Sequence, residues 1–333
     1  MQGVDPARRS RLLGLKLATL VREHLGTDGS VAPGIWPGGA ALVRDGAAWV
    51  LAEDSPERSL GPALAWARQQ SVGTVHLLAE RDTGLLARRA VYFAERPTVW
   101  TVDERRLTPA VAEPFVAAAA IDAELEALAG LIVEGGAVPV REHGVLVGEV
   151  EGLEVCRAVR DEATGACRLE VGVGAHDREA FLLIHGNVPT AESLRRVVDA
   201  VVLHRRPDAE PHPLNRLGAE RALRARIIRE PSIVGAAELA VAPPPVPRAN
   251  LKDAVPCVAA GRTEGGAPMV VGSTGIDLDL VPFAADARAA LGTPDARLVI
   301  AVPPRDRAAV TVALAGALEH PAEVVGIERL QAF

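Results

Sequence analysis

Lysine is nearly absent from this sequence. Lys16 and Lys252 are its two lysines, and all its other basic residues apart from histidine are arginines. Chemistry that depends on a lysine amine, such as a Walker A loop or a Schiff base, therefore has two candidate positions. Lys16 falls in a segment with helical periodicity and Lys252 follows a proline-rich stretch, so neither stands in such a motif. Lysine-dependent catalysis of these kinds is not expected.

Cysteine is also scarce. Cys156, Cys167 and Cys257 show no CxxC spacing and have no histidine nearby at metal-ligand spacing. We therefore expect neither a structural zinc site nor a disulfide framework, and we predict no metal and no cofactor. Small thiols in apolar segments are usually part of the packed core, which is our interpretation of these three residues.

Long apolar runs are missing as well. The most apolar helix candidate, residues 115–133, is interrupted by acidic residues and falls short of the roughly 18 uninterrupted apolar residues of a membrane span. Residues 1–25 mix arginine with leucine at helical spacing and lack the apolar core of a signal peptide. These patterns predict an amphipathic N-terminal helix in a cytoplasmic protein without a membrane segment.

The net charge of −7 disfavours a protein that coats nucleic acid through bulk electrostatics. Residues 195–229 are nevertheless rich in arginine, and Arg216, Arg221 and Arg224 are the candidate phosphate contacts of this stretch. A solvated helix surface is the favoured interpretation of these arginines, and a phosphate-binding face is the alternative.

The strongest positive signal is an internal repeat, because residues 49–68 align without a gap to residues 269–288. Both copies are predicted to run strand, strand, helix, strand, helix, strand. In the first copy these elements fall near residues 40–45, 48–53, 60–71, 74–79, 83–94 and 98–103. The identical positions are Val50, Leu60, Pro62, Ala65, Ala67 and Arg68 in the first copy and Val270, Leu280, Pro282, Ala285, Ala287 and Arg288 in the second.

The predicted fold class is therefore α/β, with duplicated ββαβαβ units and mixed, largely parallel sheets on either side of a smaller α+β middle unit. Matched apolar helices suggest that the two copies pack on each other as a pseudo-dimer. In the middle unit we expect a hairpin turning at 161–166 and helices at 177–185 and 191–205. The predicted domains are residues 1–110, 111–240 and 257–333, with a stiff proline-rich linker at 241–256.

The order of elements in each copy, with an acidic residue closing the second strand, resembles the core of the PD-(D/E)XK restriction-endonuclease-like superfamily. The resemblance implies that the (D/E)xK motif falls at Glu53, where the lysine is missing. The matching stretch of the second copy, residues 272–274, lacks the acid as well. Because such nucleases hold a divalent cation between two carboxylates while a lysine orients the attacking water, the resemblance implies domains that are inactive as nucleases. Residues 169–181 and 275–288 also make the chain similar to an uncharacterised conserved family of bacterial proteins.

The middle unit holds the catalytic candidates, which are Glu154, Glu170 and His176. Glu149, Glu151, Glu154 and Glu170 are expected on neighbouring strands, with Glu149 and Glu151 on one face. They indicate either a metal-binding acid cluster or the ordinary polar face of a half-exposed sheet. His176 is either an acid/base partner of Glu170 or Asp177, or a turn residue without a chemical role.

In the second copy, a small polar turn between strand and helix provides the ligand-binding candidates Ser273, Thr274, Asp277 and Asp279. Ligands of open α/β sheets bind at such carboxyl ends of strands. The alternative is that glycine supplies the turn while Asp277 and Asp279 cap the following helix, as Ser59 can in the first copy.

Three classes of function remain. The favoured one is a non-catalytic binding or scaffold protein with nuclease-like domains, whose partner is a protein or a nucleic acid. The alternatives are a metal-dependent nuclease or hydrolase that uses the middle-unit carboxylates, and a small-molecule or nucleotide-binding protein that uses residues 272–279. The sequence has no nucleophile elbow and no HExxH or Walker motif, so it favours a protein that is not an enzyme.

Overall fold

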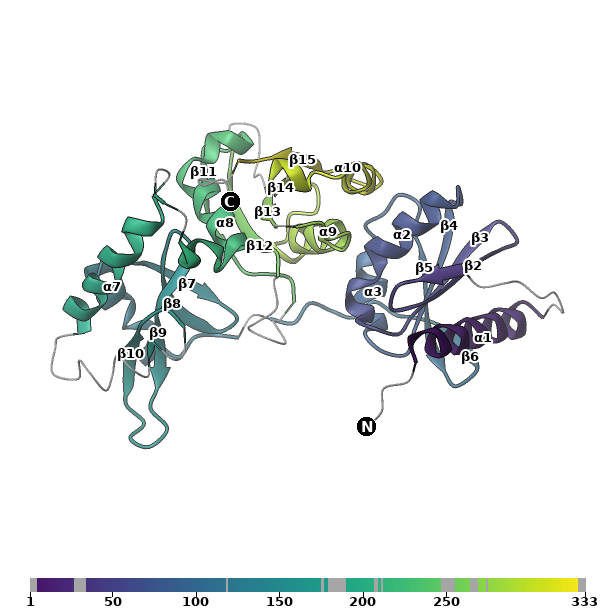
Figure 1. The fold of residues 1–333 in the computed structure, drawn as a ribbon, viewed down its shortest axis with the longest axis horizontal. Helices are drawn as coiled ribbons and strands as arrows, with labels where there is room; N and C mark the ends of the chain where they lie inside the picture. The colour runs from purple at the N-terminus through teal and green to yellow at the C-terminus, as the bar shows by residue number, and fades with distance from the viewer. Residues whose placement is uncertain are drawn as a thin grey trace. The chain divides into compact units, whose positions relative to one another are not determined.

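The chain is described here from a computed structural model (Figure 1). Its residues group into two compact units. Unit 1 comprises Met1–Phe115, Ile276–Asp295 and Ala308–Glu323, and unit 2 comprises Val116–Gly275, Ala296–Arg307 and Val324–Phe333. The residues that the structure describes are 5–26, 34–117, 119–174, 177–178, 190–206, 209–210, 212–246, 255–263, 269–273 and 275–328.

Unit 1 begins with the predicted amphipathic helix, α1 (Pro6–Leu25). The Asp5 side chain accepts a hydrogen bond from the N–H of Ala7, and Pro6 occupies the first turn, where proline is tolerated. Gly26 ends the helix at φ 64°, a left-handed conformation that glycine adopts without steric cost. In the part of the chain that the structure describes, no helix combines the length and the apolar character needed to cross a membrane.

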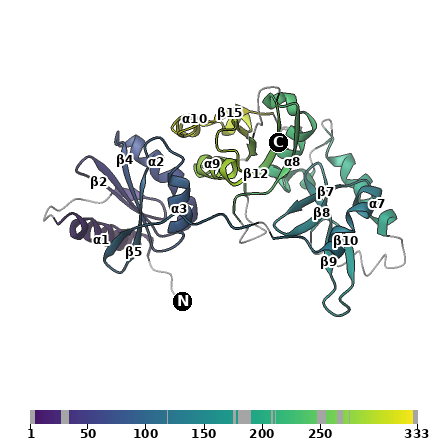
Figure 2. The same ribbon diagram turned by 180° about the vertical axis from the view of Figure 1, so that it is seen from behind.

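The sheet of unit 1 has six strands in the order β1-β2-β3-β4-β5-β6. The pairs β3–β4 and β4–β5 are parallel and the others are antiparallel. α1 covers one face and packs on Trp49, Leu51 and Leu78, while α2 (Leu60–Gln69) and α3 (Thr83–Ala90) lie on the other (Figures 1 and 2). The strands are β1 (Gly34–Trp36), β2 (Gly39–Arg44), β3 (Ala47–Ala52), β4 (Thr74–Ala79), β5 (Thr98–Asp103) and β6 (Arg106–Pro109).

Two helices from the C-terminal third, α9 (Leu280–Ala290) and α10 (Ala309–Gly316), complete unit 1. They pack on α2 and α3, which confirms the expected contact between the helices of the two repeated segments. Past the ends of α3 and α10 the backbones also pair, because Ala94 donates to the carbonyl of Ala317 at 3.1 Å and Glu319 donates to that of Tyr92 at 2.8 Å.

Unit 2 contains a four-stranded antiparallel sheet of order β10-β9-β8-β7 with α5 (Ala129–Glu134) and α7 (Thr190–His204) packed against it (Figure 2). The predicted hairpin is confirmed by reciprocal bonds around Asp161, which donates to Ala166 at 2.9 Å and accepts from Gly165 at 2.8 Å. α7 confirms the helix predicted at 191–205, whereas the one predicted at 177–185 falls almost wholly outside the described residues. The strands are β7 (Val138–Glu142), β8 (Val145–Val150), β9 (Leu153–Arg160) and β10 (Cys167–Val171).

The helix candidate at 115–133 is wrong in its first half. The described residues from 111 to 122 are not helical, and helix begins with α4 (Ala123–Glu126), followed by α5. The side chain of Asp122, which caps α4 by accepting from the N–H of Glu124, accounts for the helix starting at residue 123.

The third sheet has the order β11-β12-β13-β14-β15, with α8 (Ala219–Arg229) packed on β11, β12 and β13. As in the first sheet, an antiparallel pair, β12–β13, is followed by a parallel pair, β13–β14. The strands are β11 (Glu238–Ala242), β12 (Cys257–Arg262), β13 (Met269–Gly272), β14 (Leu298–Val302) and β15 (Glu323–Gly326), and short 3-10 helices span Pro56–Arg58, Pro213–Arg216, Pro231–Val234 and Pro304–Asp306.

These sheets confirm the predicted mixed α/β fold class. The expectation that the sheets of the duplicated units are largely parallel is wrong, because most of the described strand pairs are antiparallel and the parallel ones among them are β3–β4, β4–β5 and β13–β14. The expectation that the proline-rich linker starts at residue 241 is wrong, because Val241 and Ala242 belong to β11 and pair with β12. The first prolines come only after them, so nothing prevents these two residues from joining an edge strand. Descent of the two ββαβαβ segments from one ancestor, and the other predicted domain boundaries, stay predictions.

Candidate functional sites

The carboxyl ends of two parallel strands in unit 1 carry acidic residues that converge on a lysine. Glu53 follows β3 and Glu80 follows β4, so the parallel pairing of these strands places both at one edge of the sheet. Lys16, from α1, lies between them, with its Nζ 3.3 Å from Glu53 and 2.6 Å from Glu80. The sequence pointed to Glu53 as a site residue but not to Lys16, because Lys16 lies on a helix and not at the (D/E)xK position.

Lys16 is held as an ammonium at this edge. Burial lowers the pKa of Lys16, but the hydrogen bonds and charges of Glu80 and Glu53 outweigh it and the pKa is raised. A protonated lysine neutralises carboxylates and cannot serve as a base or nucleophile. Next to it, Arg9 forms a bidentate pair with Asp54 at 3.0 and 2.6 Å.

In unit 2, the catalytic candidate Glu154 is surrounded by arginines. Both of its oxygens accept from Arg157 at 2.9 Å, and Arg178 donates to one of them at 3.1 Å. Burial favours the neutral acid, but the arginines, Arg157 foremost, outweigh it and lower the pKa of Glu154. Glu154 is therefore an ionised, fully paired carboxylate.

The second candidate, Glu170, shares one of these arginines. Its carboxylate lies 3.8 Å from Arg178 and 3.2 Å from Arg168, so Arg178 joins Glu154 and Glu170. His176 lies outside the described residues. Among the residues that are described, no three histidine, cysteine or acidic side chains are grouped so as to hold a metal ion.

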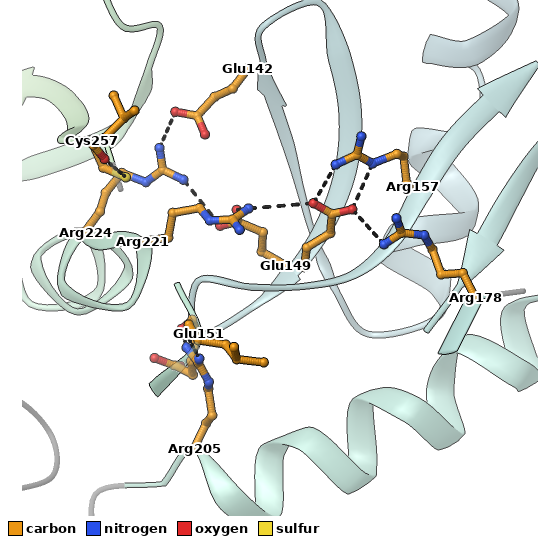
Figure 3. A network of polar contacts seen from close by, with 12 residues as sticks. Glu142, Glu149, Glu151, Arg157, Arg178, Arg205, Arg221, Arg224 and Cys257 are labelled. Atoms are coloured by element: carbon orange, nitrogen blue, oxygen red, sulfur yellow. Dashed lines mark hydrogen bonds and ion pairs between the residues drawn. The ribbon is translucent and has the colours of Figure 1, made fainter. Parts of the chain in front are cut away.

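Arg221 and Arg224 lie three residues apart on α8 and extend toward the glutamates of the sheet (Figure 3). Glu149 accepts from Arg221 at 3.2 Å and from Arg224 at 3.3 Å, and Arg224 also donates to Glu142. Burial, the largest influence, raises the pKa of Glu149 against the opposing effect of both arginines. Burial lowers the pKa of Arg224, but nearby acidic groups, Cys257 first, outweigh it and raise the pKa.

The interpretation of these two arginines as a solvated surface is wrong for Arg224, whose side chain is 2% exposed. Its partners are strand residues distant in sequence, which is why helical periodicity did not reveal them. The side chain of Arg216 lies outside the described residues. Glu151 does not share a strand face with Glu149 as expected, because it lies beyond β8 in a turn at φ 47°.

Arg205, just past α7, has no carboxylate partner in the described structure and is held by backbone carbonyls. It donates to Glu151 at 2.6 Å, to Leu214 at 2.8 Å and to Leu217. Burial, with a smaller contribution from Arg221, lowers the pKa of Arg205 to about 10, which leaves it charged at neutral pH. Its role is to join the turn after β8 to the segment that follows α7.

The ligand candidates of the second copy are bound internally where the structure describes them. The N–H of Ser273, a buried residue, donates to Ala301 at 3.1 Å, and Thr274 lies outside the described residues. Asp277 pairs with Arg58 at 2.6 Å and accepts from the N–H of Asp279 at 3.0 Å.

Asp279 and Asp286, at the buried face of α9, form ion pairs with two arginines of α3. Arg89 lies 2.7 Å from Asp279, and Arg88 lies 2.9 Å from Asp286. Burial, opposed by Arg89, raises the pKa of Asp279 to about 7. The expectation that the side chains of Asp279 and Ser59 cap their helices is wrong, since Asp279 turns to Arg89 and Ser59 donates to the carbonyl of Pro56 at 2.6 Å.

Two of the cysteines are confirmed as core residues. Cys156 and Cys257 are buried as free thiols, whereas Cys167 is partly exposed. Burial raises the pKa of both Cys156 and Cys257 to about 12, so neither forms a thiolate at neutral pH.

The chain was compared with protein-family models, with curated proteins and with solved structures, and no match was found in any of the three.

Proposed function

We propose that this protein is a non-catalytic binding protein. The observation that supports the proposal is that the described acidic candidates are already neutralised by basic side chains, Glu154 and Glu170 by arginines and Glu53 by Lys16. A carboxylate that coordinates a catalytic metal or acts as a base needs free lone pairs facing the substrate. These carboxylates instead hold elements of the fold together.

A protein partner suits this arrangement better than a nucleic acid. Arg221 and Arg224 are the described candidates for phosphate contacts. Both form ion pairs with Glu149, and Arg224 also pairs with Glu142. Breaking such pairs to reach a phosphate would leave buried carboxylates without partners, which is costly. A cytoplasmic location belongs to the same proposal, supported by the free cysteines.

The test combines an activity assay with a stability measurement. The purified protein is incubated with labelled DNA and RNA, single- and double-stranded, with Mg²⁺ or Mn²⁺, and compared with Glu154→Gln and Glu170→Gln. We expect no turnover by any of the three proteins. We expect a lower midpoint of thermal unfolding for Glu154→Gln because Arg157, Arg178 and, at 3.8 Å, Arg221 lose an ionised partner. Metal-dependent cleavage that disappears in either variant at unchanged stability would contradict the proposal.

One observation favours a second candidate, a metal-dependent nuclease in unit 1. The (D/E)xK motif of PD-(D/E)XK domains has no lysine at the corresponding position of this sequence. In the folded chain Lys16 lies beside Glu53 and Glu80 and could take the place of that lysine. Cleavage in the same assay that is lost in Lys16→Met and in Glu53→Gln, but retained in Arg9→Met, would establish this candidate. Arg9 is the matched control because it pairs with Asp54 at the same edge and forms no hydrogen bond or ion pair with Glu53 or Glu80 in the described structure.

A further inference from the structure

Unit 1 contains a cavity away from all the charged clusters described above. Its volume is about 440 Å³, which lies within the range of roughly 300 to 1,000 Å³ typical of small-molecule sites. It is lined by the C-terminal end of α2, the turn before β4, the segment after α3, and α10. Leu64, Val75, Phe93 and Leu314 give it an apolar wall, and all four are buried.

Two opposite charges lie at the rim of this cavity. Arg68 and Glu95 both line it, and both are exposed. Within the described structure neither side chain has a hydrogen bond or an ion pair with another residue, whereas the neighbouring Arg96 pairs with Glu319. The Glu95 carboxylate lies over Gly73, where a Cβ would come within 2.9 Å of its Oε2. The rim thus offers one cation and one anion to a ligand.

The aligned arginine of the second repeat behaves differently. Arg288, which corresponds to Arg68, is buried at the end of α9, and its Nη2 donates to the carbonyl of His320 at 2.9 Å. Arg68 stands at the same position of α2 but makes no such internal bond in the described residues. The end of α9 thus binds its arginine internally, whereas the end of α2 leaves the guanidinium of Arg68 available to a ligand in the cavity.

We propose that this cavity binds a small zwitterion with an aliphatic body, the chemical class of the aliphatic α-amino acids. The ligand carboxylate binds the guanidinium of Arg68, since planar donors suit a carboxylate. Its ammonium lies toward Glu95, and its side chain packs among Leu64, Phe93 and Leu314. This inference goes beyond the proposed function, which rests on residues that do not line the cavity.

The test is a calorimetric titration of the full chain with three probes that share one branched aliphatic body. Leucine carries both charged groups, isocaproate lacks the ammonium, and isoamylamine lacks the carboxylate. We expect leucine to bind most tightly and each of the others about tenfold more weakly, since one charge-assisted contact contributes about 1.4 kcal/mol. Leucine binding no tighter than that of both analogues would overturn the zwitterion assignment.

Variants separate the contacts. Arg68→Gln should weaken leucine and isocaproate about tenfold and leave isoamylamine unchanged, while Glu95→Gln should weaken leucine and isoamylamine instead. Arg8→Gln is the matched control, because Arg8 is an exposed arginine of the same unit that does not line the cavity. Equal leucine affinity in Arg68→Gln and Arg8→Gln would refute the role of Arg68.

A filling variant tests the cavity itself. Ala94 lines the cavity and is exposed, so Ala94→Leu should occupy the space and abolish leucine binding without lowering the midpoint of thermal unfolding. Unchanged binding in this folded variant would place the ligand elsewhere, and no binding of leucine to the wild-type protein at millimolar concentration would reject the site. Neither result affects the proposed function, whose activity assay does not involve these residues.

Discussion

Replacing Asp286 by asparagine should destabilise unit 1 strongly. The Asp286 side chain is 0% exposed and accepts from Arg88 at 2.9 and 3.1 Å, from Arg89 at 3.4 Å and from the hydroxyl of Tyr92 at 3.4 Å. Arg88 and Arg89 are themselves 7% and 3% exposed. Because asparagine is of similar size but carries no charge, the substitution removes the compensating charge of two buried cations and little else.

The expected loss of unfolding free energy depends on the partners that each arginine keeps in Asp286→Asn. Arg89 keeps Asp279 at 2.7 Å, whereas Arg88 keeps the half-exposed Glu113 at 3.4 Å and two backbone carbonyls. Breaking a buried ion pair by removing one partner costs about 3 to 5 kcal/mol. The remaining contacts place Asp286→Asn near the lower end of that range, at about 3 kcal/mol.

Urea unfolding followed by circular dichroism measures this loss. The matched control is Glu319→Gln, which removes the exposed ion pair with Arg96 at 3.1 Å, another link between the same two segments of the chain. An exposed pair contributes under about 1 kcal/mol, so the control should unfold nearly as the wild type does. If Asp286→Asn stayed within about 0.5 kcal/mol of the wild type, Asp286 would not be the anchor of α3 on α9.

Three further predictions concern pH, a carbonyl-bound arginine and the cysteines. Because the pKa of Asp279 is raised to about 7, the folded state holds its proton at higher pH than the unfolded state does. The unfolding free energy of the wild type relative to Asp279→Asn should therefore be highest near pH 4 and fall by up to about 1.4 kcal/mol per pH unit as the pH rises toward 7. A flat difference across this window would contradict the raised pKa. Arg205→Met should destabilise by about 2 to 4 kcal/mol in urea unfolding, since buried carbonyls lose their donor, whereas a value below about 0.5 would show that water replaces it. Cys156 and Cys257 should resist a thiol reagent at pH 8 until the protein unfolds, and their rapid labelling in the native protein would refute their burial.

The secondary structure of unit 1 could be predicted because its signals are local. The apolar run Val75–Ala79 indicated a strand covered on both faces, and β4 occupies Thr74–Ala79. The repeat then predicted the second set of elements, and β14 follows the same pattern at Leu298–Val302. Alternation and turn residues depend on neighbours only a few positions away, so one sequence is sufficient to show them.

The candidate sites could not be predicted in the same way, because their contacts join distant positions. Lys16 meets Glu80 across 64 residues, and Arg89 meets Asp279 across 190. The periodicity of a single sequence does not reveal which distant residues pair. An arginine on a helix is expected to be exposed to solvent, because burying a charge is costly. Arg224 is an exception because two glutamates on β7 and β8 compensate its charge.

The return of α9 and α10 to unit 1 also affects how the protein is made. Residues 276–323 are synthesised after all of residues 1–275, yet they complete a unit that contains the N-terminal segment. At about 5 to 20 residues per second, the 190 positions between Arg89 and Asp279 take on the order of 10 to 40 seconds to translate. During that interval α2 and α3 emerge from the ribosome with Arg88 and Arg89 uncompensated and their apolar faces uncovered. The N-terminal third therefore cannot make its contacts with α9 and α10 until these helices leave the ribosome, so unit 1 is completed only after translation has passed residue 316.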